Sequence, residues 1–327
     1  MTTKLYSKHD VKRRIDLQSA LECVEKTYIE TAHGRVLNPP KLTMHLGDDG
    51  GWPDMNAFSI NMPAYVDWLG VAGTKWAIAT WDAETEMPIS SRILLFDLER
   101  GEFKSIMEGM HLTGIRTALQ SVVGLRHLSP MMPQSVGVFG AGFQAEFQLR
   151  VVDALTTINQ FNIFDTNGER ARNLATRLRP QLDADLTVSK DPETVASSDA
   201  ILTVTNSKTP VLEESWLTDD TLVIALGSYR ELPDDTISAA DHLIVDDVEQ
   251  CLQRGVLSDM VDRGEMTQDD LDATIGEVLV DDYVSTVETD DRILFVPIGM
   301  GSLDVALAEH IHKRKSEQSD AREFEFV

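Results

Sequence analysis

The sequence predicts an α/β protein with two domains, a doubly wound parallel sheet and a discontinuous α+β domain. Length is the first reason, because 327 residues exceed the roughly 250–300 that one hydrophobic core usually holds. From residue 135 onwards, short apolar runs alternate with helical segments, which is typical of a parallel sheet covered on both faces. Before residue 112, strand-like runs are separated mainly by turn residues, which favours an antiparallel sheet.

The N-terminal third is expected to hold one long helix followed by short strands. Apolar residues recur at helical spacing up to His33, with Asp16 as the N-cap and Gly34 as the stop. A loop rich in glycine and aspartate is expected over Gly47–Pro53. The expected strands cover Lys41–His45, Ala57–Asn61, Gly73–Thr80 and Ser91–Asp97.

A helix over His111–Leu128 leads into the second domain, which is expected to contain six short apolar strands. These strands cover Val136–Phe139, Phe161–Phe164, Ala200–Thr205, Leu222–Leu226, His242–Val245 and Ile293–Pro297. The last helix, over Leu303–Lys313, is expected to pack back onto the first domain through one face, formed by Leu303, Ala306, Leu307, His310 and Ile311. The expected domains are therefore an α+β domain over residues 1–118 and 303–327 and a parallel-sheet domain over 119–302.

Acidic residues dominate the charge of the chain. Fifty-four Asp and Glu against 29 Lys and Arg give a formal net charge of −25, and the acidic residues are scattered rather than gathered in one tail. An acidic surface repels nucleic acid and anionic membranes, since binding either of them needs clustered basic residues. Only 11 of the basic residues are lysine. We therefore expect a halophilic type of surface, adapted to a salty cytoplasm where ions screen the self-repulsion.

The sequence indicates neither secretion nor a membrane or metal site. Residues 1–15 are charged and lack the apolar segment of a signal peptide, and no stretch approaches about 18 uninterrupted apolar residues. Cys23 and Cys251 have no metal-ligand spacing and are interpreted as small core residues. The eight histidines show no such spacing either. A cytoplasmic protein without a metal is expected.

The strongest local signal is a glycine-rich turn after the first apolar strand of the second domain. Residues 136–145 read VGVFGAGFQA, which is G-x-G-x-x-A between a strand and a helix. Gly140 would allow the tight turn, Gly142 would let the backbone approach a diphosphate, and Ala145 would allow close packing of helix on strand. The helix N-terminus would offer N–H groups to the phosphates. A Rossmann dinucleotide-binding domain is predicted, and the alternative is a plain strand–helix turn.

An aspartate stands where such a domain places its ribose ligand. Asp165 ends the next apolar strand, 20 residues beyond Ala145. Its carboxylate would accept hydrogen bonds from the ribose hydroxyls and would repel a 2′-phosphate, which favours NAD over NADP. Arg170 and Arg172 are close enough in the sequence to keep NADP possible. The alternative reading of Asp165 is a simple cap at a strand end.

Three basic residues of the first domain are candidates for binding an anion. Lys41 follows a double proline, Arg116 lies in the helix expected over His111–Leu128, and Lys75 lies in a strand-like run. Taken alone, each is better explained as a charged surface side chain in contact with water. Lys75 is the least ordinary of them because Trp76, Ala77 and Ile78 follow it, where a surface lysine is less expected.

The order of these motifs resembles the ornithine cyclodeaminase/mu-crystallin family from about Asp16 to His310. The resemblance is carried by Pro-Pro-Lys41, Gly-Thr-Lys75-Trp, Leu-Thr-Gly-Ile-Arg116-Thr-Ala, Gly-Ala-Gly-Phe-Gln144-Ala-Glu-Phe-Gln, and Gly227-Ser228 followed by Arg230-Glu231-Leu232. The family includes ornithine and lysine cyclodeaminases, archaeal-type alanine dehydrogenases, ketimine and pyrroline-2-carboxylate reductases, and crystallins that bind NADPH. Its members are typically homodimers whose N-terminal domain binds substrate and dimerises.

The resemblance implies a role for each matching position. Lys41, Lys75 and Arg116 would surround the carboxylate of a small amino, keto or imino acid. Lys75 would be the catalytic acid/base, and neighbouring cations would depress its pKa. The implied cofactor contacts are Ser90 near the nicotinamide, Phe143 and Gln144 against the diphosphate, Asp165 on the ribose, Thr205 and Gly227 along the cofactor, and Gly299 closing the site. Arg116, Gly140 and Gly142 are also implied to bind the cofactor.

One position departs from the cyclodeaminase pattern. Cyclodeaminases of the family have a catalytic aspartate after the glycine at position 227, where this chain has Ser228. The leading hypothesis is therefore an NAD(P)-dependent oxidoreductase that resembles alanine dehydrogenase or a ketimine reductase. The alternatives are an ornithine cyclodeaminase that makes proline and ammonia with bound NAD, and a non-catalytic dinucleotide-binding protein of the crystallin type.

Overall fold

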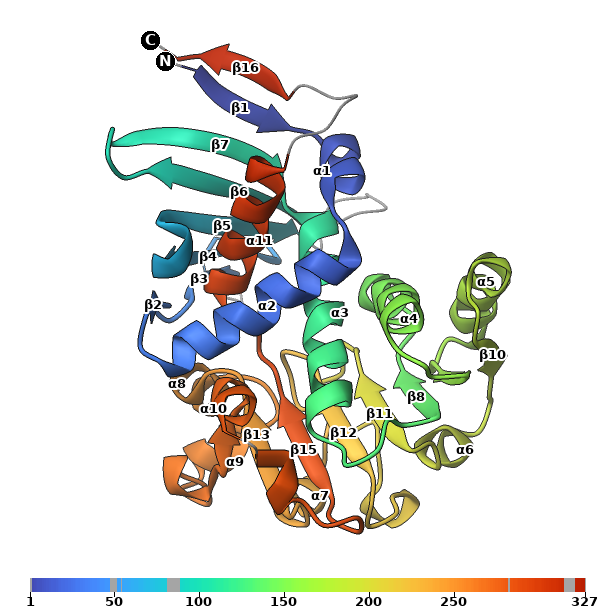
Figure 1. The fold of residues 1–327 in the computed structure, drawn as a ribbon. Coiled ribbons are helices and arrows are strands. Elements are labelled where there is room, and N and C mark those ends of the chain that lie inside the picture. Colours follow the sequence, from blue (N-terminus) through green and yellow to red (C-terminus); the bar gives the residue numbers. More distant parts are fainter. Residues whose placement is uncertain are drawn as a thin grey trace. The chain divides into compact units, whose positions relative to one another are not determined.

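The chain forms two compact units in the computed structural model, which describes residues 2–47, 52–53, 55–80, 89–281, 283–314 and 321–326. The first unit comprises Met1–Arg116 and Met300–Val327, and the second comprises Thr117–Gly299 (Figure 1). The boundary falls within the helix Met110–His127, so its residues 110–116 belong to the first unit and its residues 117–127 to the second. Most of the expected loop over Gly47–Pro53 lies outside the described residues.

The first unit is built on an eight-stranded sheet with the strand order β16-β1-β7-β6-β5-β4-β2, and β3 also pairs with β4. Strands β4 to β7 form an antiparallel meander, whereas β1 joins β7 in parallel. The elements are β1 (Thr2–Tyr6), α1 (Lys8–Arg14), α2 (Leu17–Ala32), β2 (Val36–Leu37), β3 (Leu42–Leu46), β4 (Ala57–Val66), β5 (Val71–Thr80), β6 (Ile89–Asp97), β7 (Glu102–Glu108), α3 (Met110–His127), α11 (Gly301–Lys313) and β16 (Arg322–Glu325).

Helices α2 and α11 cover one face of this sheet (Figure 1). The α2 helix begins where the sequence predicts, because the Asp16 carboxylate accepts a hydrogen bond from the Ser19 N–H. The α11 helix packs on β4, β5 and β6 and also on α2. It is therefore buried on all sides from Gly301 to Glu309, not along the single apolar face expected from its sequence.

The antiparallel sheet expected in the N-terminal third is confirmed, and its edges were missed. The predicted runs lie within or overlap β3, β4, β5 and β6. Strands β1, β2, β7 and β16 were not predicted. The partner of β1 is β7, about 100 residues later in the chain, in the register Leu5↔Ile106. The local sequence pattern of a strand does not indicate a pairing with so distant a segment.

The second unit is built on an eight-stranded sheet in which every pair is parallel, in the order β10-β9-β8-β11-β12-β15-β13-β14. From β8 the chain runs outwards through β9 and β10 and then returns to β11 on the other side. The elements are β8 (Ser135–Phe139), α4 (Phe143–Leu155), β9 (Gln160–Phe164), α5 (Gly168–Leu178), β10 (Asp185–Val188), α6 (Pro192–Ala196), β11 (Ala200–Thr203), β12 (Leu222–Ala225), α7 (Asp234–Ser238), β13 (His242–Val245), α8 (Val248–Gln253), α9 (Ser258–Asp262), β14 (Ala273–Thr274), α10 (Ile275–Val280) and β15 (Ile293–Val296).

The predicted doubly wound parallel sheet is confirmed. All six expected strands are present, and they form the buried centre of the sheet because nearly every residue of β8, β11, β12 and β15 is inaccessible. The two missed strands, β10 and β14, are the outermost ones. Cys23 and Cys251 are buried free thiols, as predicted.

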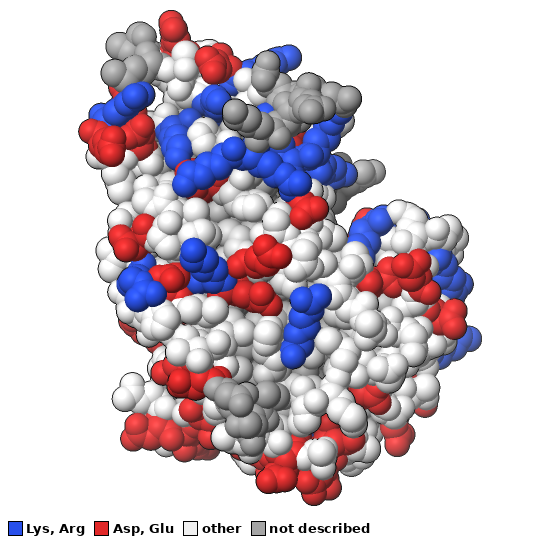
Figure 2. Space-filling view, viewed as in Figure 1, with Lys and Arg blue, Asp and Glu red and all other residues white. Residues whose placement is uncertain are grey.

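Acidic side chains are scattered over the molecular face drawn in Figure 2, while lysine and arginine gather mainly in one band on it. Among the helices that the structure describes, none is long and apolar enough to cross a membrane.

Candidate functional site

The turn after β8 needs glycine at its first position. Gly140 has a φ of 104°, a left-handed conformation that favours glycine. A Cβ at this position would lie 2.8 Å from the carbonyl oxygen of Val204, which follows the neighbouring strand β11. Both the backbone conformation and the space therefore exclude a side chain here.

Gly142 is open where Gly140 is crowded. It is the N-cap of α4, and no heavy atom lies within 4 Å of the place where its Cβ would be. The helix start is thus bare backbone that a ligand can approach closely. Phe143 and Gln144 form the first turn of α4, and Ala145 is buried against the sheet. The amide oxygen Oε1 of Gln144 is buried and has no partner among the described groups.

A crevice of about 520 Å³ opens at this turn, at the carboxyl ends of β8, β9 and β11. The strand order reverses here, which is where open α/β sheets bind ligands. The lining combines the backbone of the turn with polar side chains and with apolar ones, such as Val211 and Trp216, that suit an adenine ring. The lining includes Gly140, Ala141, Gly142, Asp165, Arg170, Pro192, Thr205, Val211 and Trp216. The residues present therefore fit a dinucleotide.

Asp165 is held rigidly at the end of β9. Its Oδ2 accepts a hydrogen bond from the Ala141 N–H at 2.8 Å, and its Oδ1 accepts one from the Asn167 N–H at 2.7 Å. Each oxygen keeps a second lone pair for a ligand hydroxyl. Arg170 lines the same crevice, whereas Arg172 is not among its lining residues.

The buried carboxylate of Glu231 joins the ends of the neighbouring strands β11 and β12. Oε1 of Glu231 accepts from the Thr205 N–H at 2.5 Å, and Oε2 accepts from the Gly227 N–H at 2.7 Å and from the Thr203 hydroxyl at 2.8 Å. Burial raises the pKa of Glu231 although these donors oppose it. A Cβ on Gly227 would lie 2.1 Å from that carboxylate, so the brace requires glycine at this position.

A second brace holds the loop after β15. Oδ2 of Asp246 accepts from the Gly299 N–H at 2.7 Å, and Oδ1 accepts from the Ile298 N–H at 3.0 Å. The amide of Gln120 in α3 also donates to this carboxylate. The predicted cofactor positions Thr205, Gly227 and Gly299 therefore all lie at strand ends, and a buried acid fixes each of them.

The first unit contains a buried cluster of ionised side chains. Oδ2 of Asp304, on α11, lies 2.7 Å from Nζ of Lys75, on β5. Its Oδ1 accepts a hydrogen bond from Nε of Arg116, on α3, at 3.3 Å. Lys75 is only 3% exposed, and Asp304 is inaccessible. Two cations thus share one carboxylate away from bulk water.

The surroundings bring the acid–base equilibrium of Lys75 into the physiological range. Burial and the positive charge of Arg116 outweigh the attraction of Asp304 and lower the pKa of Lys75 to about 8. Burial disfavours the ionised form of Asp304, but Arg116 and Lys75 overcome this and lower its pKa. Near neutral pH the cluster can therefore exchange a proton at Nζ of Lys75.

Lys41 lies on the same face of the sheet as Lys75 if the β3 register is continued. Leu42 pairs with Asn61, so the next position outwards places Lys41 opposite Met62, and Met62 pairs with Lys75. Two strand spacings, about 10 Å, would then separate the two lysines along one row.

Ser90 lies on the other face. It pairs with Ile78 and is exposed, whereas Lys75 points to the α11 side. The structure therefore does not bring Ser90 to Lys75. The buried Ser91 is the residue of this strand that faces the α11 side. Successive residues of a strand point to opposite faces of the sheet, which is why Ser90 and Ser91 differ in direction. The predicted place of Ser90 near the nicotinamide stays a prediction.

Asp304, Glu231 and Asp246 were not predicted as site residues. A signal for Asp304 exists, because it stands between Leu303 and Val305 in an apolar helix, and a buried acid must be paired. Glu231 and Asp246 carry no comparable local signal. No group of histidine, cysteine or acidic side chains among the described residues could hold a metal ion.

The model of the ornithine cyclodeaminase/mu-crystallin family matches residues 1–319. Alanine dehydrogenase of Archaeoglobus fulgidus is 27% identical over 321 residues, which are 96% of this chain and 95% of the relative.

Two solved structures share the fold. An archaeal alanine dehydrogenase dimer with bound NAD has a TM-score of 0.89 at 23% identity and matches over 100% of both chains. Delta(1)-pyrroline-2-carboxylate reductase of Thermococcus litoralis, in complex with NADH and L-proline, has a TM-score of 0.87 at 22% identity. This match covers 95% of the present chain and 97% of the reductase.

Proposed function

The chain belongs to the ornithine cyclodeaminase/mu-crystallin family, and we propose that it is an NAD-dependent oxidoreductase acting on a small α-amino, α-keto or cyclic imino acid. The second unit supplies the dinucleotide site, at the Gly140–Gln144 turn. The first unit supplies the substrate site, around Lys75 and Arg116.

The buried cluster in the first unit is the observation that carries this function. Lys75 and Arg116 bring two positive charges to the single negative charge of Asp304, so the cluster has an excess of positive charge. A substrate carboxylate would neutralise that excess, with Arg116 and Lys41 as further donors. The same cluster contains an amine whose pKa is about 8, suited to proton transfer near neutral pH.

Different residues bind the cofactor, orient the substrate and transfer the proton. The α4 N-terminus, Gly142 and Asp165 hold the dinucleotide, which supplies a hydride acceptor or donor when it is bound. Arg116 orients the carboxylate of the substrate. Lys75 gives a proton to the substrate nitrogen or oxygen during reduction and takes it back during oxidation.

The structure favours this function over cyclodeamination. Ser228, at the position of the cyclodeaminase aspartate, is exposed and offers only a hydroxyl. The nearby Asp234 is engaged by Arg230 at 3.0 Å and by Arg263 at 2.8 Å, in the first turn of α7. Neither Ser228 nor Asp234 therefore offers an unengaged carboxylate for the acid/base role of that reaction at the amino group.

Asp165 supports a preference for NAD over NADP. Its carboxylate is fixed by two backbone N–H groups inside the crevice, so a ribose 2′-phosphate would meet a negative charge that cannot turn away. Arg170 lines the crevice beside it and could soften this discrimination.

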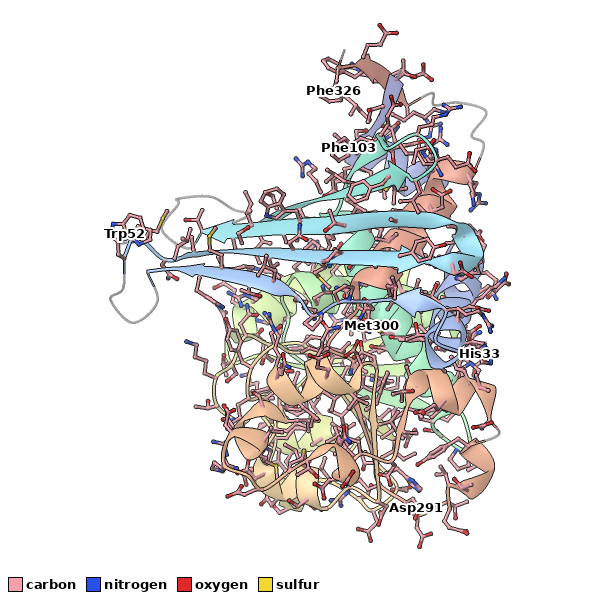
Figure 3. All side chains as sticks on the ribbon, turned by 90° about the vertical axis from the view of Figure 1, so that its left-hand side faces the viewer. His33, Trp52, Phe103, Asp291, Met300 and Phe326 are labelled. Atoms are coloured by element: carbon pink, nitrogen blue, oxygen red, sulfur yellow. The ribbon has the colours of Figure 1, made fainter. Side chains whose placement is uncertain are left out.

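The uncovered face of the first unit's sheet supports a homodimer. Leu42, Met44, Trp76 and Ile78 are large apolar side chains more than half exposed on this face, opposite α11. Figure 3 shows Trp52 at the far tip of the same sheet. The occupant we propose is a second copy of this chain, because the archaeal alanine dehydrogenase that shares the fold is a dimer. Ile78→Asp should then give a monomer in light scattering, and the exposed Met131→Asp in the second unit should not.

The net charge of −25 supports a salty cytoplasm as the setting. Scattered like charges repel one another, and a high ion concentration screens that repulsion.

Turnover assays with purified protein test the proposed reaction. An alanine dehydrogenase reduces NAD with alanine and oxidises NADH with pyruvate and ammonia, whereas an imine reductase oxidises NADH with Δ1-pyrroline-2-carboxylate. A cyclodeaminase releases ammonia from ornithine without net change in NADH absorbance. Turnover of NADH with a substrate of the first group is the expected result. Ammonia release from ornithine alone would replace the proposal by cyclodeamination, and NADH binding without turnover would favour the crystallin type.

A matched pair of lysine variants ties activity to the site. Lys75→Met should lower turnover by about 10²–10⁴-fold, the usual contribution of a general acid or base. Lys26→Met is the control, because Lys26 is exposed on α2, where it stacks on Trp68. If both variants kept full activity, Lys75 would have no part in the reaction.

A further inference from the structure

Asp304 joins Lys75 and Arg116 through its two oxygens, at 2.7 Å and 3.3 Å. We propose that Asp304 is a positioning residue for the reaction. It holds the Lys75 amine in place, keeps that amine protonated for transfer, and leaves the cluster with the single positive charge that one substrate carboxylate neutralises. This inference rests on the function proposed above, and it assigns a task to a group that does not itself touch the substrate.

The groups that face Lys75 come from four elements. The neighbouring strands contribute apolar side chains, Met62 from β4 and Ile93 from β6. Helix α3 contributes Arg116 and α11 contributes Asp304, and these are the charged groups of the described chain that act on the amine. Among the described residues, Asp304 is therefore the one negative charge that opposes burial and Arg116 at Nζ of Lys75. Without it, both remaining influences favour the neutral amine.

The backbone around Asp304 is fixed tightly enough to position a charge. A Cβ on Gly301 would lie 2.7 Å from the carbonyl oxygen of Met62, so α11 begins in direct contact with β4. One residue later, the Ser302 N–H donates to Oδ1 of Asn38 at 3.1 Å. Asp304 is in the first turn of this helix, where the aligned peptide dipoles stabilise a carboxylate.

In the direction of reduction, the C=N carbon of an imino acid would take a hydride, with its two electrons, from the reduced dinucleotide. An N–H bond of the Lys75 ammonium breaks, its electron pair stays on Nζ, and the proton forms a new N–H bond on the substrate nitrogen. Lys75 is then neutral beside ionised Asp304 and Arg116. The negative charge of Asp304 next favours recapture of a proton from water, which restores the ammonium for another turnover.

Removal of the charge of Asp304 with its shape retained is the direct test. Asp304→Asn should lower kcat for imine reduction at pH 8 by about fivefold, since a drop of one unit from a pKa of about 8 lowers the protonated fraction at that pH from about one half to about one eleventh. The falling limb of the pH–rate profile should move to lower pH, because Lys75 loses its proton more readily. The Kd for NADH should stay within about twofold of the wild type.

A second acid on the same helix provides the matched control. Glu309 is also inaccessible on α11 and pairs with Lys104 at 2.5 Å, apart from Lys75. Glu309→Gln should leave the pH–rate profile unmoved even if it lowers stability. Asp304→Glu keeps the charge and displaces it, so it should lower kcat while the limb stays at the wild-type pH.

A readout that does not depend on turnover comes from NMR. In protein that contains ¹³C-labelled lysine, the Cε signal that is missing from the spectrum of Lys75→Met belongs to Lys75. The pKa read from the titration of this signal should be lower in Asp304→Asn than in the wild type. If wild-type protein turned over none of the proposed substrates, the proposed function would fail, and this titration would still decide whether Asp304 sets the proton affinity of Lys75.

Three outcomes would overturn the proposal. One is an unmoved Lys75 titration in Asp304→Asn. Another is a loss of activity in that variant with the pH–rate profile in place, which is the behaviour of a purely structural acid. If Asp304→Asn does not fold, Asp304→Glu decides, because wild-type kcat in that variant would show that the position of the charge is unimportant.

Discussion

The amine Nζ of Lys75 lies 2.7 Å from Oδ2 of Asp304, and both side chains are buried inside the first unit. Burying an ion pair costs desolvation energy that the pairing seldom recovers fully, so such a pair is weak evidence for stability. Here a second cation, Arg116, shares the carboxylate, which leaves an excess of positive charge. A cluster of this kind is better explained by a task at a functional site than by the fold alone.

Opposite pH profiles are expected for the two directions of the reaction. The pKa of Lys75 is lowered to about 8, so its ammonium is depleted as pH rises through that value. The kcat/KM for imine reduction, which needs the ammonium, should fall about tenfold per pH unit above this point. The kcat/KM for oxidation, which needs the neutral amine, should rise with pH and level off there. Initial rates from pH 6 to about pH 10 check this, and parallel profiles in the two directions would contradict the assigned role.

Two glycines of one turn should respond differently to the same substitution. Gly140→Ala places a Cβ 2.8 Å from a carbonyl oxygen at a φ of 104°, so it should lower the thermal midpoint as well as NADH affinity. Gly142→Ala meets no neighbouring atom in the protein and should leave the midpoint unchanged. It should still weaken NADH binding by about tenfold or more, because its methyl group occupies the approach to the diphosphate. Fluorescence titration with NADH and thermal unfolding measure the two effects. Normal affinity in Gly142→Ala would remove the diphosphate from this turn.

The parallel sheet could be predicted from the sequence because its central strands are buried on both faces. Continuous apolar runs such as Val136–Phe139 and Ile293–Val296 exist only where no face is left for polar residues. The outer strand β10, in contrast, alternates exposed and buried residues over four positions and lies beside charged turns, so it lacks that signature. The glycine-rich turn could be predicted for a related reason, since its backbone conformation demands particular residues.

The charged part of the candidate site could be predicted only in part. Lys75 was identifiable because a lysine in an apolar strand needs an explanation. Its partner Asp304 lies more than 200 residues away and meets it only through packing of α11 on β5. The carboxylate braces of Glu231 and Asp246 join strand ends that are neighbours in the sheet and not in the sequence. Ser90, predicted to lie near the nicotinamide, is exposed on the face of the sheet opposite Lys75, and its role stays a prediction.

Glu231 should matter for both stability and cofactor affinity. Its carboxylate is the acceptor in all three of its hydrogen bonds, which come from the Thr205 and Gly227 N–H groups and the Thr203 hydroxyl. In Glu231→Gln an NH₂ group would face one of these N–H donors, which leaves buried polar groups unsatisfied. We expect a loss of about 1–3 kcal/mol in the free energy of unfolding, measured with urea, and weaker NADH binding. Glu249→Gln, on the exposed side of α8, should change neither quantity. Wild-type affinity for NADH in Glu231→Gln would show that the brace does not shape the cofactor site.

The choice between the two dinucleotides should depend on Asp165. Asp165→Ser removes the negative charge at the ribose site, so KM for NADPH should fall and KM for NADH should rise, shifting the ratio of kcat/KM by about tenfold or more. Asp153→Ser is a matched control. Asp153 also accepts hydrogen bonds from backbone N–H groups, those of Asp183 and Ala184, but it is not among the residues that line the crevice. An unchanged NADH-to-NADPH ratio in Asp165→Ser would place cofactor discrimination elsewhere.

Salt should stabilise the folded chain. A net charge of −25 makes the compact state repel itself, and an increase of KCl from about 0.1 M to about 1 M shortens the screening length from about 10 Å to about 3 Å. The thermal midpoint should therefore rise by about 5 °C or more, which corresponds to roughly 1–2 kcal/mol for units of this size. Sucrose at matched osmolality controls for excluded volume and should raise the midpoint less, since it leaves the charges unscreened. A midpoint that stayed flat or fell with KCl would mean that the acidic residues are already neutralised by local pairing, and the case for a salty cytoplasm would be lost.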